Sequence, residues 1–281
     1  MANATATGFV VGPAPEIHGE AGGEGLPIVL CHGITATRRY VVQGSRVLER
    51  AGHRVVSYDA RGHGESDPAP AGEGYGYPQL VGDLERVVAA EAGEGRFVLA
   101  GHSMGAHTAV AYALRHPDRL AGLVVVGPAF TGETSVDSLR YWDGLAAALE
   151  QGGVDGFADY IGANQGIDSA WRDSVLRFTR ERIGLHRHPE ALVQALREVT
   201  RSRPFGSLQE LRSLRVPALV VASHDEADPG HPFAVAAAYA EALPNSRLIS
   251  EAAGESPLAW QGGRLSREIA AFCADPEVAG S

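Results

Sequence analysis

The amino-acid sequence predicts an α/β fold, in which parallel strands alternate with helices. Short apolar runs, typical of strands that are buried on both faces, occur at residues 26–31, 54–58, 96–100 and 120–126. Segments that favour helices lie between them, at residues 39–51, 79–90 and 104–116. A chain of 281 residues is long enough for one large α/β domain with an inserted subdomain.

The composition disfavours several classes of protein. Hydrophobic residues make up 44% and charged residues 21% of the chain, as in ordinary globular proteins. A formal net charge of −10 disfavours nucleic acid and anionic membranes as partners. The sequence has no apolar run of membrane-spanning length and no recognisable signal peptide. We therefore expect a cytoplasmic protein in which Cys31 and Cys273 are buried free thiols.

The N-terminal third contains two loops with distinctive residues. Residues 8–25 alternate weakly and end in a Gly/Glu-rich turn, which is typical of an edge hairpin. The run 26–31 leads into Cys31-His32-Gly33-Ile34-Thr35, and the run 54–58 leads into Asp59-Ala60-Arg61-Gly62-His63-Gly64-Glu65-Ser66. We expect Asp59 and Arg61 to tie this Gly-rich loop together by charge-assisted hydrogen bonds.

The most informative stretch is Gly101-His102-Ser103-Met104-Gly105, where an apolar run ends and a helix-forming run begins. This is the G-x-S-x-G pattern of a nucleophile elbow. A sharp strand-to-helix turn strains the serine backbone, and side chains at the glycine positions would collide with neighbouring elements. A chain with 35 glycines can carry such a pattern by chance, but the strand before it and the helix after it favour an exposed Ser103 nucleophile.

The remainder of the chain divides at Gly127. About seventy-five residues follow with helical periodicity, and their aromatic side chains are either core or the face of a pocket: Trp142, Phe157, Tyr160, Trp171 and Phe178. An apolar run at 216–222 then predicts a strand, and a polar loop follows it. Pro232 suits the first turn of a helix to about residue 243. A short strand at 247–250 and a helix at 262–272 complete the pattern.

Together these motifs resemble the α/β-hydrolase family over nearly the whole chain. The resemblance implies a mostly parallel eight-stranded sheet with helices on both faces, formed by residues 1–130 and 206–281, and a helical cap inserted at 131–205. It also implies a Ser-acid-His triad in this chain order. In the family's oxyanion turn, which His32 and Gly33 match, the second oxyanion donor corresponds to the backbone N–H of Ile34. The first is the N–H of Met104.

The family places the triad acid after the strand at 216–222, in the arrangement G-x-x-D-x-x-x-P. Asp225 and Pro229 keep this spacing, although Ala222 replaces the glycine, so Asp225 is the expected acid and Asp228 the reserve. The family then places Gly-His after the last strand. Here the matching position holds Glu255, and no histidine occurs after His231.

Three interpretations of this departure remain. Glu255 could be a carboxylate base, with a pKa raised by burial and by a nearby carboxylate. A histidine from elsewhere could substitute: His231 is the preferred one, and His102, beside the nucleophile, could line the pocket. Otherwise the hydrolytic cycle is lost. For both histidines a packed or solvated structural role is the alternative.

The family resemblance implies a serine hydrolase that acts on a small carboxylic ester, thioester or lactone through a Ser103 acyl-enzyme. The competing expectation is a non-hydrolytic homologue, which either binds a ligand or acts as a lyase or isomerase with Glu255 as acid and base. No metal or organic cofactor is implied, because no H-E-x-x-H, Cys pair or dinucleotide fingerprint occurs. The expected partner is a small-molecule substrate, and homo-oligomerisation is left open. An acidic site would disfavour anionic substrates.

Overall fold

Eight strands form one sheet in the computed structural model, which describes residues 6–224 and 228–280. Their order across the sheet is β1-β2-β4-β3-β5-β6-β7-β8. The two pairings that involve β2 are antiparallel and the others are parallel. The strands are β1 (Thr7–Val11), β2 (Ile17–Gly22), β3 (Pro27–Cys31), β4 (Arg54–Tyr58), β5 (Phe97–His102), β6 (Leu120–Val126), β7 (Ala218–Val221) and β8 (Ser246–Ile249).

Helices cover both faces of this sheet. The helices are α1 (Val47–Arg50), α2 (Tyr77–Glu91), α3 (Met104–Arg115), α4 (Val136–Asn164), α5 (Ser169–Ile183), α6 (Pro189–Val199), α7 (Phe233–Ala242), α8 (Gly262–Cys273) and α9 (Pro276–Ala279). Short 3-10 turns occur at Pro117–Arg119, Leu208–Ser213 and Leu258–Trp260. In the described part of the chain, no helix is both long and apolar enough to cross a bilayer.

The apolar side chains form a separate core on each face of the sheet. One core joins α2, α3 and α7 to the sheet through residues such as Leu84, Val110 and Tyr239. The other joins α1, α8 and α9 to the opposite face through residues such as Leu48 and Ile269. Burial of this surface provides the main driving force for folding. Because helices cover both faces, the central strands are apolar along their length, as the sequence indicated.

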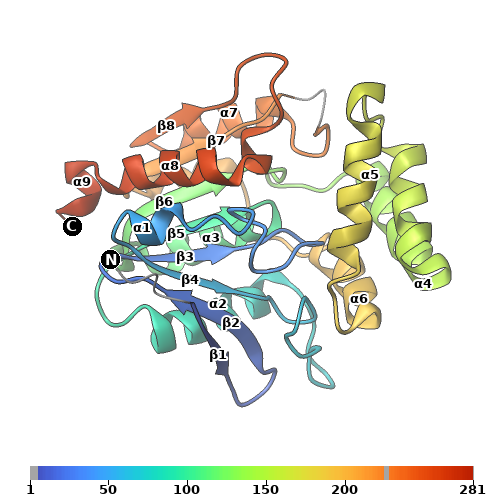
Figure 1. Cartoon of the computed structure of the whole chain (residues 1–281), viewed down its shortest axis with the longest axis horizontal. Coiled ribbons are helices and arrows are strands. Elements are labelled where there is room, and N and C mark those ends of the chain that lie inside the picture. The colour runs from blue at the N-terminus through green and yellow to red at the C-terminus, as the bar shows by residue number, and fades with distance from the viewer. Residues whose placement is uncertain (1–5, 225–227, 281) are drawn as a thin grey trace.

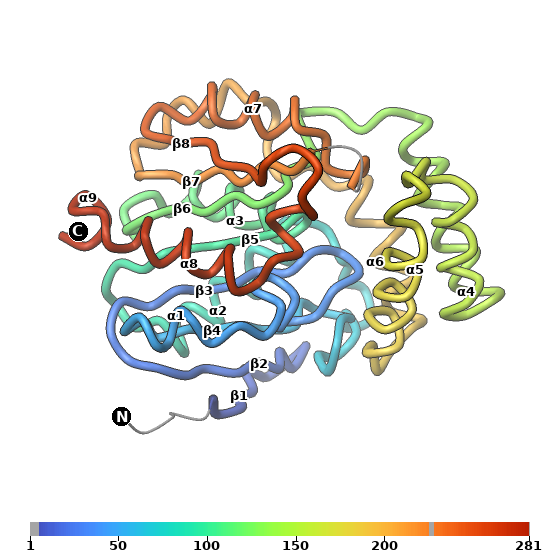
Figure 2. The backbone as a smooth tube through the Cα atoms, turned by 45° about the horizontal axis from the view of Figure 1, so that its top comes forward, coloured from blue at the N-terminus to red at the C-terminus, as the bar shows by residue number. Residues whose placement is uncertain are grey.

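The helices α4, α5 and α6 lie together beside one end of the sheet (Figures 1 and 2). We call residues 136–199 the helical insertion. A third apolar cluster joins it to the main body, where Leu145 and Leu196 of the insertion belong to the same cluster as Ile34 and Met104. A break at Gly153, where φ is 58°, divides α4. The insertion therefore lies over the loops that leave β3 and β5.

The expected α/β fold, with eight mostly parallel strands and helices on both faces, is confirmed. Most predicted elements begin and end within two residues of the observed ones. The helix predicted at 39–51 is wrong, because only Val47–Arg50 is helical. Gln43 and Gly44 have φ values of 49° and 69°, a left-handed conformation that cannot continue a right-handed helix.

Asp59 and Arg61 both hold the Gly-rich loop by charge-assisted hydrogen bonds, as expected, and the two side chains bind different partners. Asp59 accepts hydrogen bonds from the backbone and guanidinium of Arg38, at 2.7 Å and 2.9 Å. Arg61 forms a bidentate ion pair with Asp83 on α2, at 2.6 Å and 2.8 Å. The Gly-rich loop is therefore tied to its neighbours by two separate ion pairs.

Replacing Asp83 by asparagine is expected to lower the free energy of unfolding by about 3 kcal/mol. The change leaves the buried Arg61 guanidinium without its main counter-charge. Urea unfolding, followed by circular dichroism, measures the effect. Asp137→Asn is the control, since Asp137 and its partner Arg140 are largely exposed and such pairs contribute about 0–1 kcal/mol. Equal stability losses in both variants would contradict this assignment.

Candidate active site

Ser103 occupies the turn between β5 and α3 with φ 54° and ψ −117°, a strained conformation for a residue with a side chain. Its backbone N–H donates to the carbonyl of Val126 at 3.0 Å. A Cβ atom at Gly101 would overlap the carbonyl oxygen of Gly105, and one at Gly105 would overlap that of Cys31. Both glycines are thus required by close backbone approach, as the nucleophile-elbow pattern predicts.

Ser103 lines a cavity of about 240 Å³ between the carboxyl ends of the strands and the helical insertion. The main body contributes Gly33, Ile34, His102, Ser103, Asp228, His231 and Trp260. The insertion contributes Tyr141, Trp142, Leu145, Phe157, Ile161, Val175, Phe178, Thr179 and Arg182. The sequence did not decide whether five aromatic residues of this segment belong to the core or to a pocket. Three of them line the cavity: Trp142, Phe157 and Phe178. The wall is largely apolar, with a few polar groups, as is usual for small-molecule sites.

His231 and Asp228 form a hydrogen-bonded pair in this cavity. The Nδ1–H of His231 donates to Oδ2 of Asp228 at 2.8 Å, and both side chains are mostly buried. The pair lies in the loop between β7 and α7, where the amide of His231 also donates to the carbonyl of Asp228. The imidazole of His231 lies close to Gly127, where an added Cβ would be 3.3 Å from its Cγ.

Burial and charge act in opposite directions on this pair. Burial lowers the pKa of His231, but attraction and hydrogen bonding by Asp228 outweigh burial and raise that pKa above its ordinary value of 6.5. Burial raises the pKa of Asp228, but the facing His231 outweighs burial and lowers it. The pair therefore favours an ionised carboxylate beside an imidazole that can hold a proton.

His102 lies beside this pair, with its ring centroid 5.0 Å from that of His231. Burial lowers the pKa of His102 to about 3, and its Nε2 atom is sealed from solvent without a hydrogen-bond partner in the described structure. An imidazole with so low a pKa is a weak base and therefore a poor acceptor for a serine proton. Ligand atoms of His102, Asp228 and His231 lie within 4.8 Å of one another, a spacing that could also hold a metal ion.

Two backbone amides near Ser103 are unpaired. Within residues 6–224 and 228–280, the N–H groups of Ile34 and Met104 donate no hydrogen bond. Met104 is the first residue of α3, so its amide also carries the positive end of the helix dipole. The carbonyl of Ile34 lies 2.6 Å from Nε2 of His63, which fixes the orientation of this loop.

His32, which was expected in the pocket, is instead a structural residue. Its Nδ1–H donates to the carbonyl of Gly33 at 2.8 Å, and its Nε2 accepts from the amide of Ala60 at 2.9 Å. The ring is buried between the loops that follow β3 and β4, and it does not line the cavity. Gly33 and His102, the other two residues expected in the pocket, do line it.

The structure places Glu255 away from this cavity. Its carboxylate is exposed and pairs with Arg264 at 2.6 Å, and this bond lowers the pKa of Glu255. The buried carboxylate of the same loop is Glu251, which accepts from the amides of His224 and Leu258 at 2.6 Å and 2.8 Å. The expectation of a buried Glu255 with a raised pKa is therefore wrong. Asp225, the expected acid, lies outside the described residues.

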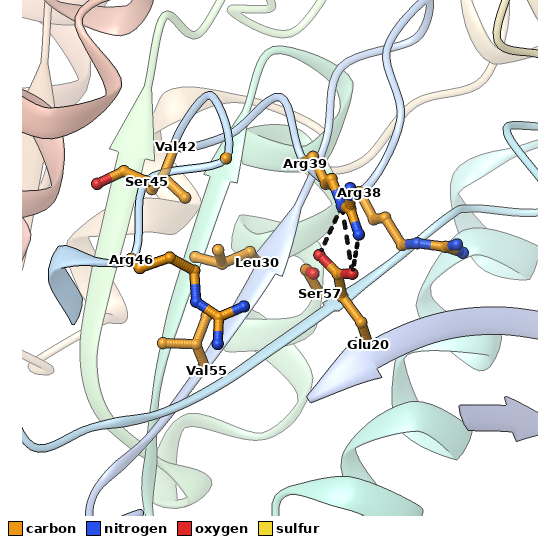
Figure 3. A pocket seen from close by; sticks show the side chains of 10 residues that line it. Glu20, Leu30, Arg38, Arg39, Val42, Ser45, Arg46, Val55 and Ser57 are labelled. Atoms are coloured by element: carbon orange, nitrogen blue, oxygen red, sulfur yellow. Dashed lines mark hydrogen bonds and ion pairs between the residues drawn. The ribbon is translucent and has the colours of Figure 1, made fainter. Parts of the chain in front are cut away.

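A second cavity, of about 270 Å³, lies beside β2, β3 and β4 (Figure 3). Three arginines line it, and each is paired with a carboxylate. Arg39 binds Glu20 in a bidentate pair (Figure 3), Arg38 binds Asp59, and Arg46 binds Glu49. Since these charges neutralise one another, the cavity beside Ser103 is the stronger candidate for a functional site.

Sequence reasoning missed Arg182, a cation in the wall of the Ser103 cavity. The helix α5 contains four arginines at irregular spacing, and nothing in the local pattern distinguishes the one that faces inwards. The sequence offered Asp228 as the reserve to Asp225, which lies outside the described residues. The spacing of three residues between Asp228 and His231 was a usable signal, because it matches one turn.

Comparison with known proteins agrees with this geometry. The family model for the alpha/beta hydrolase fold matches residues 27–261. An epoxide hydrolase B from Mycobacterium tuberculosis is 37% identical over 109 residues, which cover 39% of this chain and 30% of that protein. An sn-1-specific diacylglycerol lipase from Mus musculus is 36% identical over 108 residues, which cover 38% of this chain and 34% of that protein. The matches thus span well under two thirds of these relatives.

Among solved structures, a thermophilic esterase from Thermogutta terrifontis with malate bound has a TM-score of 0.77 and 25% sequence identity. That likeness covers 95% of this chain and 97% of the esterase. The family match extends over most of the chain, and the strand order, the strained serine turn and the position of the helical insertion agree with it. The chain therefore belongs to the α/β hydrolase fold family.

Proposed function

We propose that this protein hydrolyses a small carboxylic ester, thioester or lactone through an acyl-enzyme on Ser103. The observation that carries the proposal is the strained Ser103 turn in the same cavity as the hydrogen-bonded pair of Asp228 and His231. The relatives include proteins named as a lipase and an esterase. The chain order Ser103, Asp228, His231 is also the order of a Ser-acid-His triad.

In the proposed first step, Oγ of Ser103 attacks the carbonyl carbon while its proton passes to Nε2 of His231. Nδ1–H of His231 is already committed to Asp228, so this hydrogen bond presents Nε2 as the basic nitrogen. The new C–O bond gives a tetrahedral intermediate, and its negative charge falls on the former carbonyl oxygen. The unpaired amides of Ile34 and Met104 are suited to stabilise that charge.

The intermediate then expels an alcohol or thiol, which takes the proton from His231, and leaves the acyl group on Ser103. Water then attacks the acyl carbon and gives one proton to His231. The bond from the acyl carbon to Oγ breaks, Oγ takes the proton back from His231, and the carboxylic acid leaves. Asp228 stabilises the imidazolium that forms in both halves of the cycle. Each step thus begins and ends with the groups that the cavity already holds.

This proposal assigns the base to His231 and gives no chemical role to Glu255. An exposed carboxylate with a lowered pKa is a weaker base than an imidazole whose pKa is raised. The same observation removes support from a lyase or isomerase that uses Glu255 as acid and base. We further propose that the helical insertion acts as a cap, because its apolar residues close the cavity above Ser103.

Reaction with a small fluorophosphonate tests the proposed function. We expect a single covalent adduct, detected by intact mass, which is absent in Ser103→Ala. Labelling between pH 5 and 9 should slow at low pH, because protonated His231 cannot accept the serine proton. The midpoint should lie above the ordinary imidazole pKa of 6.5.

Folding controls make the outcome decisive. The wild-type protein and Ser103→Ala should give the same circular dichroism spectrum and unfolding midpoint before labelling. Folded wild-type protein that forms no adduct at any pH would contradict serine hydrolysis. An adduct that persists in Ser103→Ala would place the nucleophile elsewhere.

A further inference from the structure

Arg182 is a cation in the largely apolar wall of the Ser103 cavity. It lies in the last turn of α5, and the lining around it on the insertion includes Leu145, Phe157 and Val175. Asp228, the single carboxylate among the described lining residues, is hydrogen-bonded to His231. Arg182 therefore adds a positive charge to a cavity whose other charged pair is internally balanced.

Arg182 has no partner within the described structure. Its side chain makes no hydrogen bond or ion pair there, and its Nε atom is sealed from solvent with no acceptor. Tyr40 and Tyr141 share the cavity, but burial raises the pKa of both phenols, so they remain uncharged. Burial also lowers the pKa of Arg182 itself. An unpaired, desolvated donor of this kind is costly, and a ligand that supplies an acceptor would offset that cost.

Other arginines show how unusual this environment is. Arg180, two residues earlier on α5, is also of intermediate exposure, but it pairs with Asp155 at 2.9 Å and Asp159 at 3.1 Å. The arginines around the second cavity are each paired with a carboxylate, as Figure 3 shows for Arg39 and Glu20. Among residues 6–224 and 228–280, Arg182 thus lacks the carboxylate partner that its counterparts have.

We propose that Arg182 binds a free carboxylate of the substrate, so that the ester, thioester or lactone carries a second, ionised carboxyl group. The planar guanidinium fork matches a carboxylate in a bidentate manner. The cavity of about 240 Å³ suits a short molecule that spans from Ser103 to Arg182. The identity of the reacting bond rests on the proposed function, whereas the carboxylate site rests on Arg182 alone.

This assignment reverses the expectation that the site disfavours anions. That expectation placed Glu255 beside a second carboxylate in the pocket, whereas Glu255 is exposed and paired with Arg264. Among the described residues, the charged groups that line the cavity are Arg182 and the Asp228–His231 pair.

A binding experiment tests the site without requiring turnover. Glutaric acid monoamide and glutaramide have nearly the same size, but only the first carries a carboxylate. Trp142 and Trp260 line the cavity, so their fluorescence reports binding. We expect the monoamide to bind the wild-type protein about 10–100-fold more tightly than glutaramide, the range for a charge-assisted hydrogen-bonded pair. Equal affinities in the folded wild-type protein would overturn the proposal without any variant.

Three variants assign the effect to Arg182. Arg182→Gln should reduce the preference for the monoamide to less than about threefold, and Arg182→Lys should retain part of it because the charge remains. Arg180→Gln, the matched change on the same helix, should leave it unchanged. A preference that survives in folded Arg182→Gln would overturn the proposal.

A kinetic comparison connects the site to the proposed reaction. The mono-4-nitrophenyl ester of glutaric acid and 4-nitrophenyl pentanoate differ chiefly in a terminal carboxylate. Arg182→Gln should lower the ratio of their kcat/KM values by about 10–100-fold, whereas Arg180→Gln should not. Fluorophosphonate labelling of Ser103 without a monoamide preference would overturn only the carboxylate site. A monoamide preference without labelling would support that site and contradict the hydrolase.

Discussion

His231→Ala is expected to lower kcat/KM for a 4-nitrophenyl ester by about 10³-fold, whereas Glu255→Gln should change it by less than about twofold. The imidazole of His231 lies in the cavity with Ser103, and Asp228 holds its Nδ1–H at 2.8 Å. The carboxylate of Glu255 is exposed and engaged by Arg264. Initial rates at pH 8, with matched protein concentrations, provide the comparison.

Chemical rescue distinguishes a lost base from a lost fold. Added imidazole should restore part of the activity of His231→Ala, because a diffusible base can occupy the space that the side chain leaves. It should not affect Ser103→Ala. The assignment is contradicted if Glu255→Gln loses as much activity as His231→Ala while both proteins remain folded.

The parts of the fold that local patterns determine were predictable from the sequence. The apolar runs gave the central strands because burial on both faces leaves no room for polar alternation. The glycines around Ser103 indicated the elbow, since Gly101 and Gly105 approach neighbouring backbone too closely for any Cβ. The helix predicted at 39–51 failed because periodicity does not reveal that Gln43 and Gly44 take left-handed conformations.

The parts of the candidate site that depend on tertiary contacts were harder to predict. Family spacing pointed to Asp225, which lies outside the described residues, and to the position of Glu255, which is exposed. The described structure brings Asp228 and His231 together on one loop. The sequence offered His231 only as one of three interpretations. Arg182 could not be selected from α5, because only the folded chain shows that Arg182 lies in the cavity wall without an ion-pair partner among the described residues.

The order Ser103, Asp228, His231 suggests how a histidine could act from an unusual position. The loop after β7 ends beside the cavity, as does the turn after β5, because both strands are parallel and leave the sheet at the same edge. A histidine on this loop can therefore enter the same cavity as a serine on that turn. A triad requires only that the histidine and the serine meet in one cavity, so it does not depend on which strand the histidine follows.

Asp228→Asn is expected to lower kcat/KM by about 10²–10⁴-fold and, at the same time, to shift the acid limb of the pH profile to lower pH. The carboxylate raises the pKa of His231 against the effect of burial. Without that charge, burial and the repulsion from Arg182 remain, and both lower the pKa of His231. Because the base acts when neutral, the residual activity should persist at a pH where wild-type activity has already declined.

At low pH, the general loss of kcat/KM in Asp228→Asn is partly offset by the lower pKa of His231, which keeps more of the imidazole neutral. This change in the shape of the pH profile makes the test specific. A merely structural role for Asp228 would reduce activity at every pH without moving the midpoint. Measurement of kcat/KM from pH 5 to 9 separates the two cases, with unfolding midpoints checked at both limits. An unchanged or higher midpoint in the folded variant would contradict the electrostatic coupling of Asp228 to His231, and would leave the histidine without the partner that orients its proton.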